Sequence, residues 1–181
     1  MTTPSIAESI EESLILTLVD VANHLTRNGE RLAQREGLTA QQWLLLLQIA
    51  GDANFPRHDD SAADDAPVVA SAIATARGVS RPTISALVSA LVHKGLVSQT
   101  DDPLDRRQKT LRVTARGLAV LQRMEPARQR ANQALLAEFS ERELQKVLLV
   151  LRSCLATLWR QGSAAARGGR RTSAPPGRPS K

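Results

Sequence analysis

Residues 71–99, SAIATARGVSRPTISALVSALVHKGLVSQ, carry the clearest structural signal in this chain. A run of small and apolar residues over 70–77 ends at Gly78, and a second run opens after Ser80. Glycine readily adopts the left-handed conformation that ends a helix, and a serine side chain can accept the first free N–H group of the next one. Ala74 is small enough to let two crossed helices touch beside the turn. The segment therefore predicts a helix-turn-helix.

The second helix of this pair, residues 81–94, has one apolar face and one face of small polar residues. Its apolar positions repeat at helical spacing and predict the buried side: Ile84, Leu87, Val88 and Leu91. An ordinary exposed face would be rich in Glu and Lys, whereas a slim face flanked by arginine suits the major groove of DNA. The residues expected to contact DNA here are Ser80, Arg81, Pro82, Thr83, Ser85, Ala86 and Ser89.

After this helix the apolar period changes to two. Residues 96–100 and 110–113 alternate in the manner of paired strands and predict a β-hairpin. A hairpin tip with Pro and Asp is unremarkable, but this one also carries three closely spaced basic residues, Arg106, Arg107 and Lys109, beside Asp105. A carboxylate can orient a guanidinium, and such a tip suits a phosphate backbone or a minor groove.

Charge is unevenly distributed along the 181 residues, whose formal net charge is +6. Residues 70–123 hold nine basic and three acidic side chains, whereas residues 1–69 hold four and eleven. Clustered Lys and Arg predict a polyanionic partner. The single cysteine excludes an internal disulfide, and no apolar run reaches the ~18 residues that a membrane span needs. The acidic N-terminus differs from a secretory signal, so we expect a cytoplasmic protein with no membrane contact.

Helices are predicted on both sides of this central segment. Ser5 and Glu8 have capping-box spacing ahead of an apolar stripe that runs from Ile6 to Leu32. Thr39 and Gln42 form a second such pair, before an apolar helix that stops at Gly51. The helix after Thr114 is expected to kink or break at Pro126. The last predicted helix opens at Ser140 and Glu143 and carries the stripe Leu144, Val147, Leu148, Leu151, Leu155 and Leu158.

Terminal helices with such wide stripes need a surface to pack on. Periodicity alone leaves two arrangements open, a second subunit or a monomeric helical bundle. Two further segments have no apolar periodicity: the acidic loop 51–67 and the tail 161–181, which is basic, rich in Gly and Pro, and expected to be disordered.

The chain resembles the MarR family of transcriptional regulators over residues 9–160. Three motifs carry the resemblance in the family's order: residues 71–99, DPLDRRQKTLRVTARG at 102–117, and FSERELQKVLLVL at 139–151. The resemblance implies a mainly α fold with a small two-stranded β-wing. It makes the helix over 80–94 the recognition helix and the hairpin with Asp105, Arg106 and Arg107 the wing.

The implied organisation is one MarR-type domain over residues 1–160. A winged helix-turn-helix fills 39–113, dimerisation helices fill 6–36 and 115–160, and a basic tail follows. The resemblance also tips the choice of assembly toward a homodimer on double-stranded DNA with a palindromic operator. It implies a repressor that a small-molecule effector releases, with effector-binding residues unassigned. Charged residues common on the family's recognition helix are replaced by small ones, Ala86, Ser89 and Ala90, which predicts fewer base contacts.

Other functions find less support in the sequence. His24, His58 and His93 lack metal-ligand spacing, so we expect no metal and no cofactor. No catalytic nucleophile has a plausible histidine partner, which argues against an enzyme. Cys154, beside Leu155 on an apolar helix, is expected to be a small buried hydrophobic residue. The alternative function is a dimeric protein-interaction module with decayed or nonspecific DNA binding, whose acidic loop and basic tail bind partners.

Overall fold

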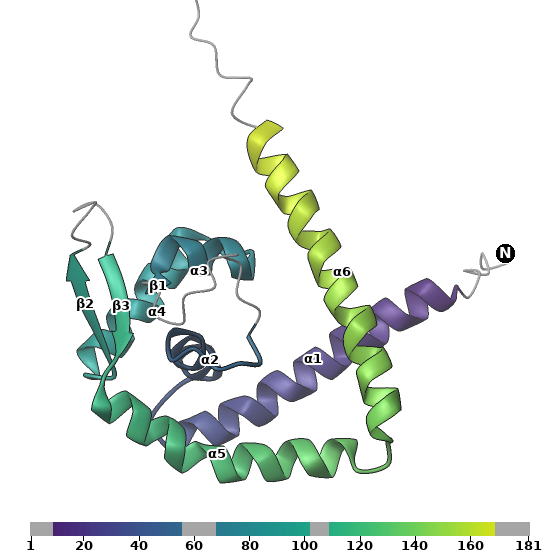
Figure 1. Ribbon diagram of the computed structural model, residues 1–181, viewed down its shortest axis with the longest axis horizontal. Helices are drawn as coiled ribbons and strands as arrows, with labels where there is room; N and C mark the ends of the chain where they lie inside the picture. The colour runs from purple at the N-terminus through teal and green to yellow at the C-terminus, as the bar shows by residue number, and fades with distance from the viewer. Residues whose placement is uncertain (1–8, 56–67, 102–108, 169–181) are drawn as a thin grey trace, which may run out of the picture.

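The computed structural model describes residues 9–55, 68–101 and 109–168, and its fold is mainly α with one small antiparallel sheet (Figure 1). The elements in chain order are α1 (Ile10–Gln34), α2 (Ala40–Ile49), β1 (Val68–Val69), α3 (Ala70–Arg77), α4 (Arg81–His93), β2 (Val97–Asp101), β3 (Lys109–Val113), α5 (Ala115–Leu136) and α6 (Glu141–Gly168). The expected fold class is confirmed.

The core of the molecule is built around α2, which Figure 1 shows enclosed by the surrounding helices. Leu45 and Leu46 of this helix are fully buried. The predicted capping box at its start is present, because Thr39 Oγ1 accepts from the Gln42 N–H at 3.1 Å and the Gln42 side chain accepts from the Thr39 N–H at 3.2 Å. We call the unit formed by α2, α3, α4 and the sheet the head.

The sheet has three strands in the order β1, β3, β2, one more than the sequence predicted. The hairpin pairs Val97 with Val113 at one end and Asp101 with Lys109 at the other. The added strand, β1, is only two residues long and pairs antiparallel with β3. Two residues are too few to show an alternation, which explains why no pattern indicated this strand.

Three predicted helix limits were wrong. Helix α1 begins at Ile10, and its capping side chain is that of Ser9, which accepts from the Glu12 N–H at 3.3 Å; Ser5 lies outside the described residues. Helix α5 continues through Pro126 to Leu136, so of the expected kink or break, the break is absent. Helix α6 ends at Gly168, eight residues beyond the expected limit at 160.

Helix α6 adds no residue to the core of the chain and stands away from the head in Figure 1. Its stripe is exposed to solvent, with Leu148 46% and Leu158 62% accessible. Large apolar side chains of α1, from Ile10 to Leu25, are likewise exposed to solvent. The monomeric bundle is therefore wrong for this chain, and so is the expected burial of Cys154, which is exposed on α6. Among the described helices, none is long and apolar enough to cross a membrane.

Candidate nucleic-acid interface

The turn between α3 and α4 has the geometry that its sequence predicted. Gly78 ends α3 with φ +62°, in the left-handed region. A Cβ atom at this glycine would meet nothing within 4 Å, so conformation and not space selects glycine here. The Val79 N–H donates to the Ala74 carbonyl at 3.1 Å and closes the turn.

Ser80 caps the first turn of α4, as expected. Its Oγ accepts from the Thr83 N–H at 3.2 Å, and the two hydroxyl oxygens lie 2.7 Å apart. Pro82 occupies the first turn, where its missing N–H would have no helical partner. The hydroxyl groups of Ser80 and Thr83 are thus bonded to each other at the exposed end of the helix.

The two faces of α4 divide as the sequence predicted. Ile84, Val88 and Leu91 are buried against the core, and Leu87 is partly buried. The opposite face exposes the predicted contact residues Arg81, Thr83, Ser85, Ala86 and Ser89. Helix α4 contains no Asp or Glu, so its outward surface carries no charge that would repel a phosphate.

The wing is described only in part. Lys109 is exposed and lies opposite Asp101, at the end of the hairpin that adjoins residues 102–108. Arg106 and Arg107 lie outside the described residues, so their roles stay a prediction. Two further exposed basic residues, Arg112 on β3 and Arg116 at the start of α5, were missed in the sequence. The alternation of β3 was the signal that could have placed Arg112 on the outer face.

Arg77 is a second residue that sequence reasoning missed. Its Nη2 group donates a long hydrogen bond, 3.4 Å, to the side-chain oxygen of Gln41 and so links α3 to α2. Burial lowers the pKa of this guanidinium, and its Nη1 atom is buried with no hydrogen-bond partner. Within the described part of the chain, no group of three His, Cys, Asp or Glu side chains could hold a metal ion.

Comparison with known proteins shows which proteins share this architecture. Residues 36–108, which include α2, the helix-turn-helix and β2, match the model of the MarR family. Over these residues the chain is similar to the MarR family. A Thauera aromatica protein named as a regulator of the hcr operon is 36% identical over 93 residues, 51% of this chain and 54% of that protein. The chain thus spans about half the length of the curated relative that it matches.

Solved structures of MarR-family proteins share the whole fold at low sequence identity. A MarR protein from Peptoclostridium difficile superposes with a TM-score of 0.72 at 14% identity, over 91% of this chain and 97% of that one. The S. aureus MepR protein, solved in a complex with DNA, has a TM-score of 0.63 at 20% identity, over 83% of this chain and 99% of that one. At this identity the likeness concerns the fold alone.

Proposed function

We propose that this chain is a MarR-family regulator of the cytoplasm, a sequence-specific, DNA-binding transcriptional regulator and not an enzyme. The observation that carries the proposal is the outer face of α4, which is exposed, free of acidic residues and led by Arg81. A helix of this kind fits the major groove, where small side chains let the backbone approach the bases. The S. aureus MepR protein, which shares this fold, has been solved in a complex with DNA.

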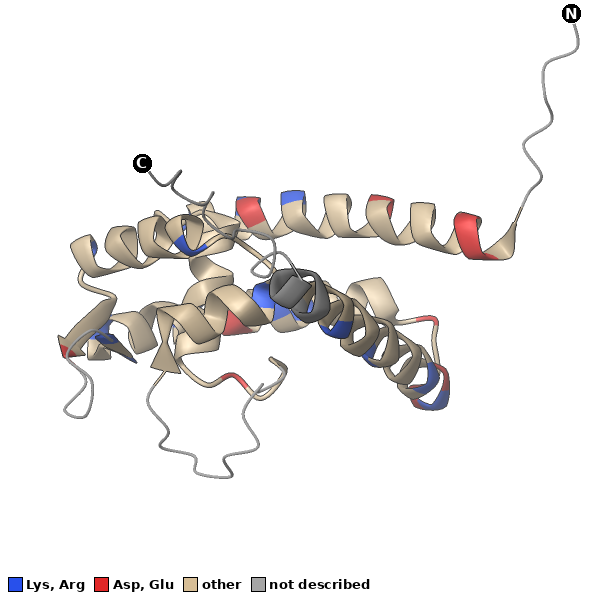
Figure 2. Ribbon diagram, turned by 90° about the horizontal axis from the view of Figure 1, so that it is seen from above, with Lys and Arg blue, Asp and Glu red and all other residues tan. Residues whose placement is uncertain are grey.

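The DNA-binding unit is proposed to be a homodimer formed by α1 and α6. Both helices expose large apolar side chains that no other described part of the chain covers, among them Leu14, Leu25, Leu148 and Leu158. Figure 2 shows acidic residues at the N-terminal end of α1, where Glu11 and Glu12 lie in the first turn. Helix α6 carries basic residues such as Arg152, and this opposite charge suits packing between two copies.

Twofold symmetry would present two heads to one duplex. Recognition helices that read successive turns lie about 34–36 Å apart, so the operator is proposed to be a palindrome. Repression, and release by a small-molecule effector, are proposed on the resemblance to the family. Of the described aromatic residues, Trp43 is buried in the core.

The decisive experiment is selection of duplexes from a random library by the purified chain. The proposal predicts an enriched palindrome, bound equally well by a chain that ends at Gly168, where α6 ends. Loss of all selectivity would favour the alternative, a dimeric interaction module whose DNA reading has decayed. Binding to every duplex without preference would identify a nonspecific DNA-coating protein.

The wing is tested on the selected duplex by replacing Arg106 and Arg107 with alanine together. Each lost phosphate contact should reduce the slope of log affinity against log salt by ~0.9. Replacing Arg170 and Arg171 of the tail with alanine removes the same charge and should leave the slope unchanged. Equal effects of the two double variants would contradict the wing assignment.

A further inference from the structure

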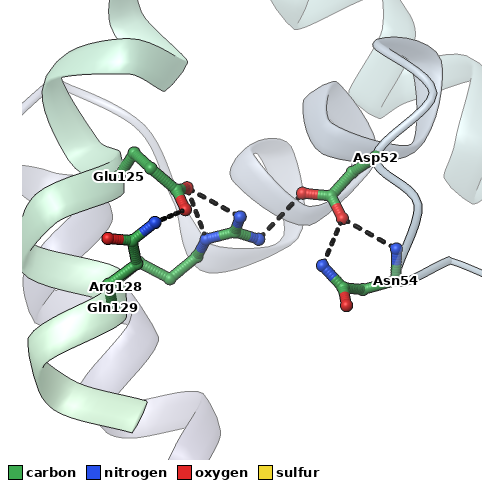
Figure 3. Close-up of polar contacts among 5 residues, drawn as sticks. All are labelled: Asp52, Asn54, Glu125, Arg128 and Gln129. Atoms are coloured by element: carbon green, nitrogen blue, oxygen red, sulfur yellow. Dashed lines mark hydrogen bonds and ion pairs between the residues drawn. The ribbon is translucent and has the colours of Figure 1, made fainter. Parts of the chain in front are cut away.

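A polar contact joins α5 to Asp52, in the turn that follows α2 of the head, beyond the last buried residue of α5 (Figure 3). The buried residues of α5 are Gly117, Val120 and Met124, all within its first three turns. After Arg128, every residue of the helix from Gln129 to its end is exposed. The direction of the outer part of α5 therefore depends on what holds Arg128.

Pro126 lies between the last buried residue of α5 and Arg128. A proline has no N–H, so the hydrogen bond to the Gln122 carbonyl is missing, and its ring crowds the preceding turn. Sharp bends in helices occur mostly at such positions. The helix is consequently easiest to bend immediately before the contact at Arg128.

The contact is an ion pair across two separate parts of the chain. Arg128 Nη1 lies 2.9 Å from Asp52 Oδ2, and Arg128 Nη2 lies 2.6 Å from Glu125 Oε2. Figure 3 shows the guanidinium between the two carboxylates. The side chains of Arg128 and Asp52 are only 20% and 11% exposed, so solvent screens this pair less than a surface pair.

Asp52 is fixed to the core of the head. Its Oδ1 accepts from the backbone N–H of Asn54 at 2.9 Å and from the Asn54 amide at 2.8 Å. Its own N–H donates to the carbonyl of Leu47, a buried residue of α2, at 3.1 Å. A carboxylate held on both sides offers Arg128 a rigid partner.

We infer that the Arg128–Asp52 ion pair is a brace that sets the direction of α5 across Pro126. Helix α6 follows the outer part of α5 after a short turn and has 28 residues, a length of about 42 Å at 1.5 Å per residue. A small change of direction at Pro126 is therefore enlarged along α6. Where α6 joins two copies, as the proposed function requires, the brace fixes the spacing of the two heads, and Arg128 is a positioning residue.

The brace is tested first without DNA, by the distance between spin labels on one chain. Labels at Ser89 on α4 and Gln133 on α5 are both exposed and report the angle between head and outer α5. The background is Cys154→Ser, and labelled chains are diluted with unlabelled ones. Arg128→Met and Asp52→Asn should broaden or shift the distance distribution, whereas Arg128→Lys, which keeps the charge, should restore it.

The matched control is Arg123→Met, on the same helix but before Pro126. Arg123 pairs with Glu36 at 2.6 Å, next to the buried part of α5, and its loss should leave the distribution unchanged. A wild-type distribution in Arg128→Met would overturn the brace. Should that variant fail to fold, Asp52→Asn, which nearly preserves shape, decides the same question.

A second measurement links the brace to half-site spacing. The probes are the selected duplex, the same duplex with two base pairs inserted between its half-sites, and a single half-site. Arg128→Met should reduce the preference for the selected spacing by roughly tenfold and leave half-site affinity unchanged, because only the relative placement of the heads changes. An unchanged preference would overturn the role in spacing. Failure to select any duplex would defeat the proposed function, while the label distances would still decide on the brace.

Discussion

Gly117 lies where α5 packs closely against Leu96 and Val113, beside the hairpin. A Cβ atom there would lie 2.3 Å from the Leu96 carbonyl oxygen and 2.7 Å from Val113 Cγ2. The carbonyl cannot easily move, because it accepts the Thr114 N–H at 3.0 Å. We expect Gly117→Ala to lower the free energy of unfolding by about 1–3 kcal/mol through overpacking, measured by urea denaturation.

Gly162 provides the control for this substitution. It also lies in a helix, and a Cβ atom there would meet nothing within 4 Å. Gly162→Ala should raise helix stability by about 0.5–1 kcal/mol, because alanine loses less backbone entropy than glycine. The same loss in both variants would show that close packing at Gly117 is not the cause.

Asp52 should make the stability of the chain depend on pH. Burial raises the pKa of its carboxyl group, but hydrogen bonds from Asn54 and Arg128 outweigh burial and hold the pKa below the ordinary value of 3.8. The folded state therefore favours the carboxylate. Its stabilisation is complete above the unfolded pKa and is lost as pH falls through the folded pKa. Urea unfolding of wild type and Asp52→Asn between pH 7 and pH 3 should show a difference that shrinks in acid; a constant difference would contradict this.

At the scale of single elements, local signals predicted the structure well. Gly78 and Ser80 act through bonds to residues at most five positions away, so sequence reasoning found both the turn and the start of α4. The Arg128–Asp52 pair joins residues 76 positions apart, and no local pattern indicates such a contact. Pro126 was expected to kink or break α5; the helix does not end there, because a proline inside a helix can be tolerated where other contacts hold the chain.

The serine cap of α4 can be tested as an element of its own. Ser80→Ala removes the acceptor of the Thr83 N–H and should lower the free energy of unfolding by about 1 kcal/mol. Ser80→Gly should cost only a few tenths of a kcal/mol, since glycine is a tolerated cap. Ser85→Ala, on the exposed face of the same helix, should change stability by less than about 0.5 kcal/mol. Equal losses at Ser80 and Ser85 would show that the cap contributes nothing specific.

At the scale of the whole molecule, the exposed stripe of α6 governs assembly. Leu148 lies in this stripe and is 46% exposed in the single chain. In the proposed dimer, Leu148→Glu would bury a carboxylate without a partner, which is costly in an apolar interface. We expect a monomer in sedimentation velocity, with helical content retained because α6 adds nothing to the core. Its affinity for the selected palindrome should fall to that for a half-site.

Gln145→Glu is the matched control, since it adds the same carboxylate on α6 at a position outside the stripe. This variant should remain a dimer and keep the affinity for the palindrome. If both variants remain dimers, the interface lies elsewhere on the chain. If the wild-type protein is itself a monomer, the proposed dimer is wrong. Monomers of both variants would mean that added charge, and not loss of apolar contact, separates the subunits. If Leu148→Glu separates the subunits and Gln145→Glu does not, the apolar stripe determines where the two copies of α6 meet. The stripe then also sets the spacing of the two heads.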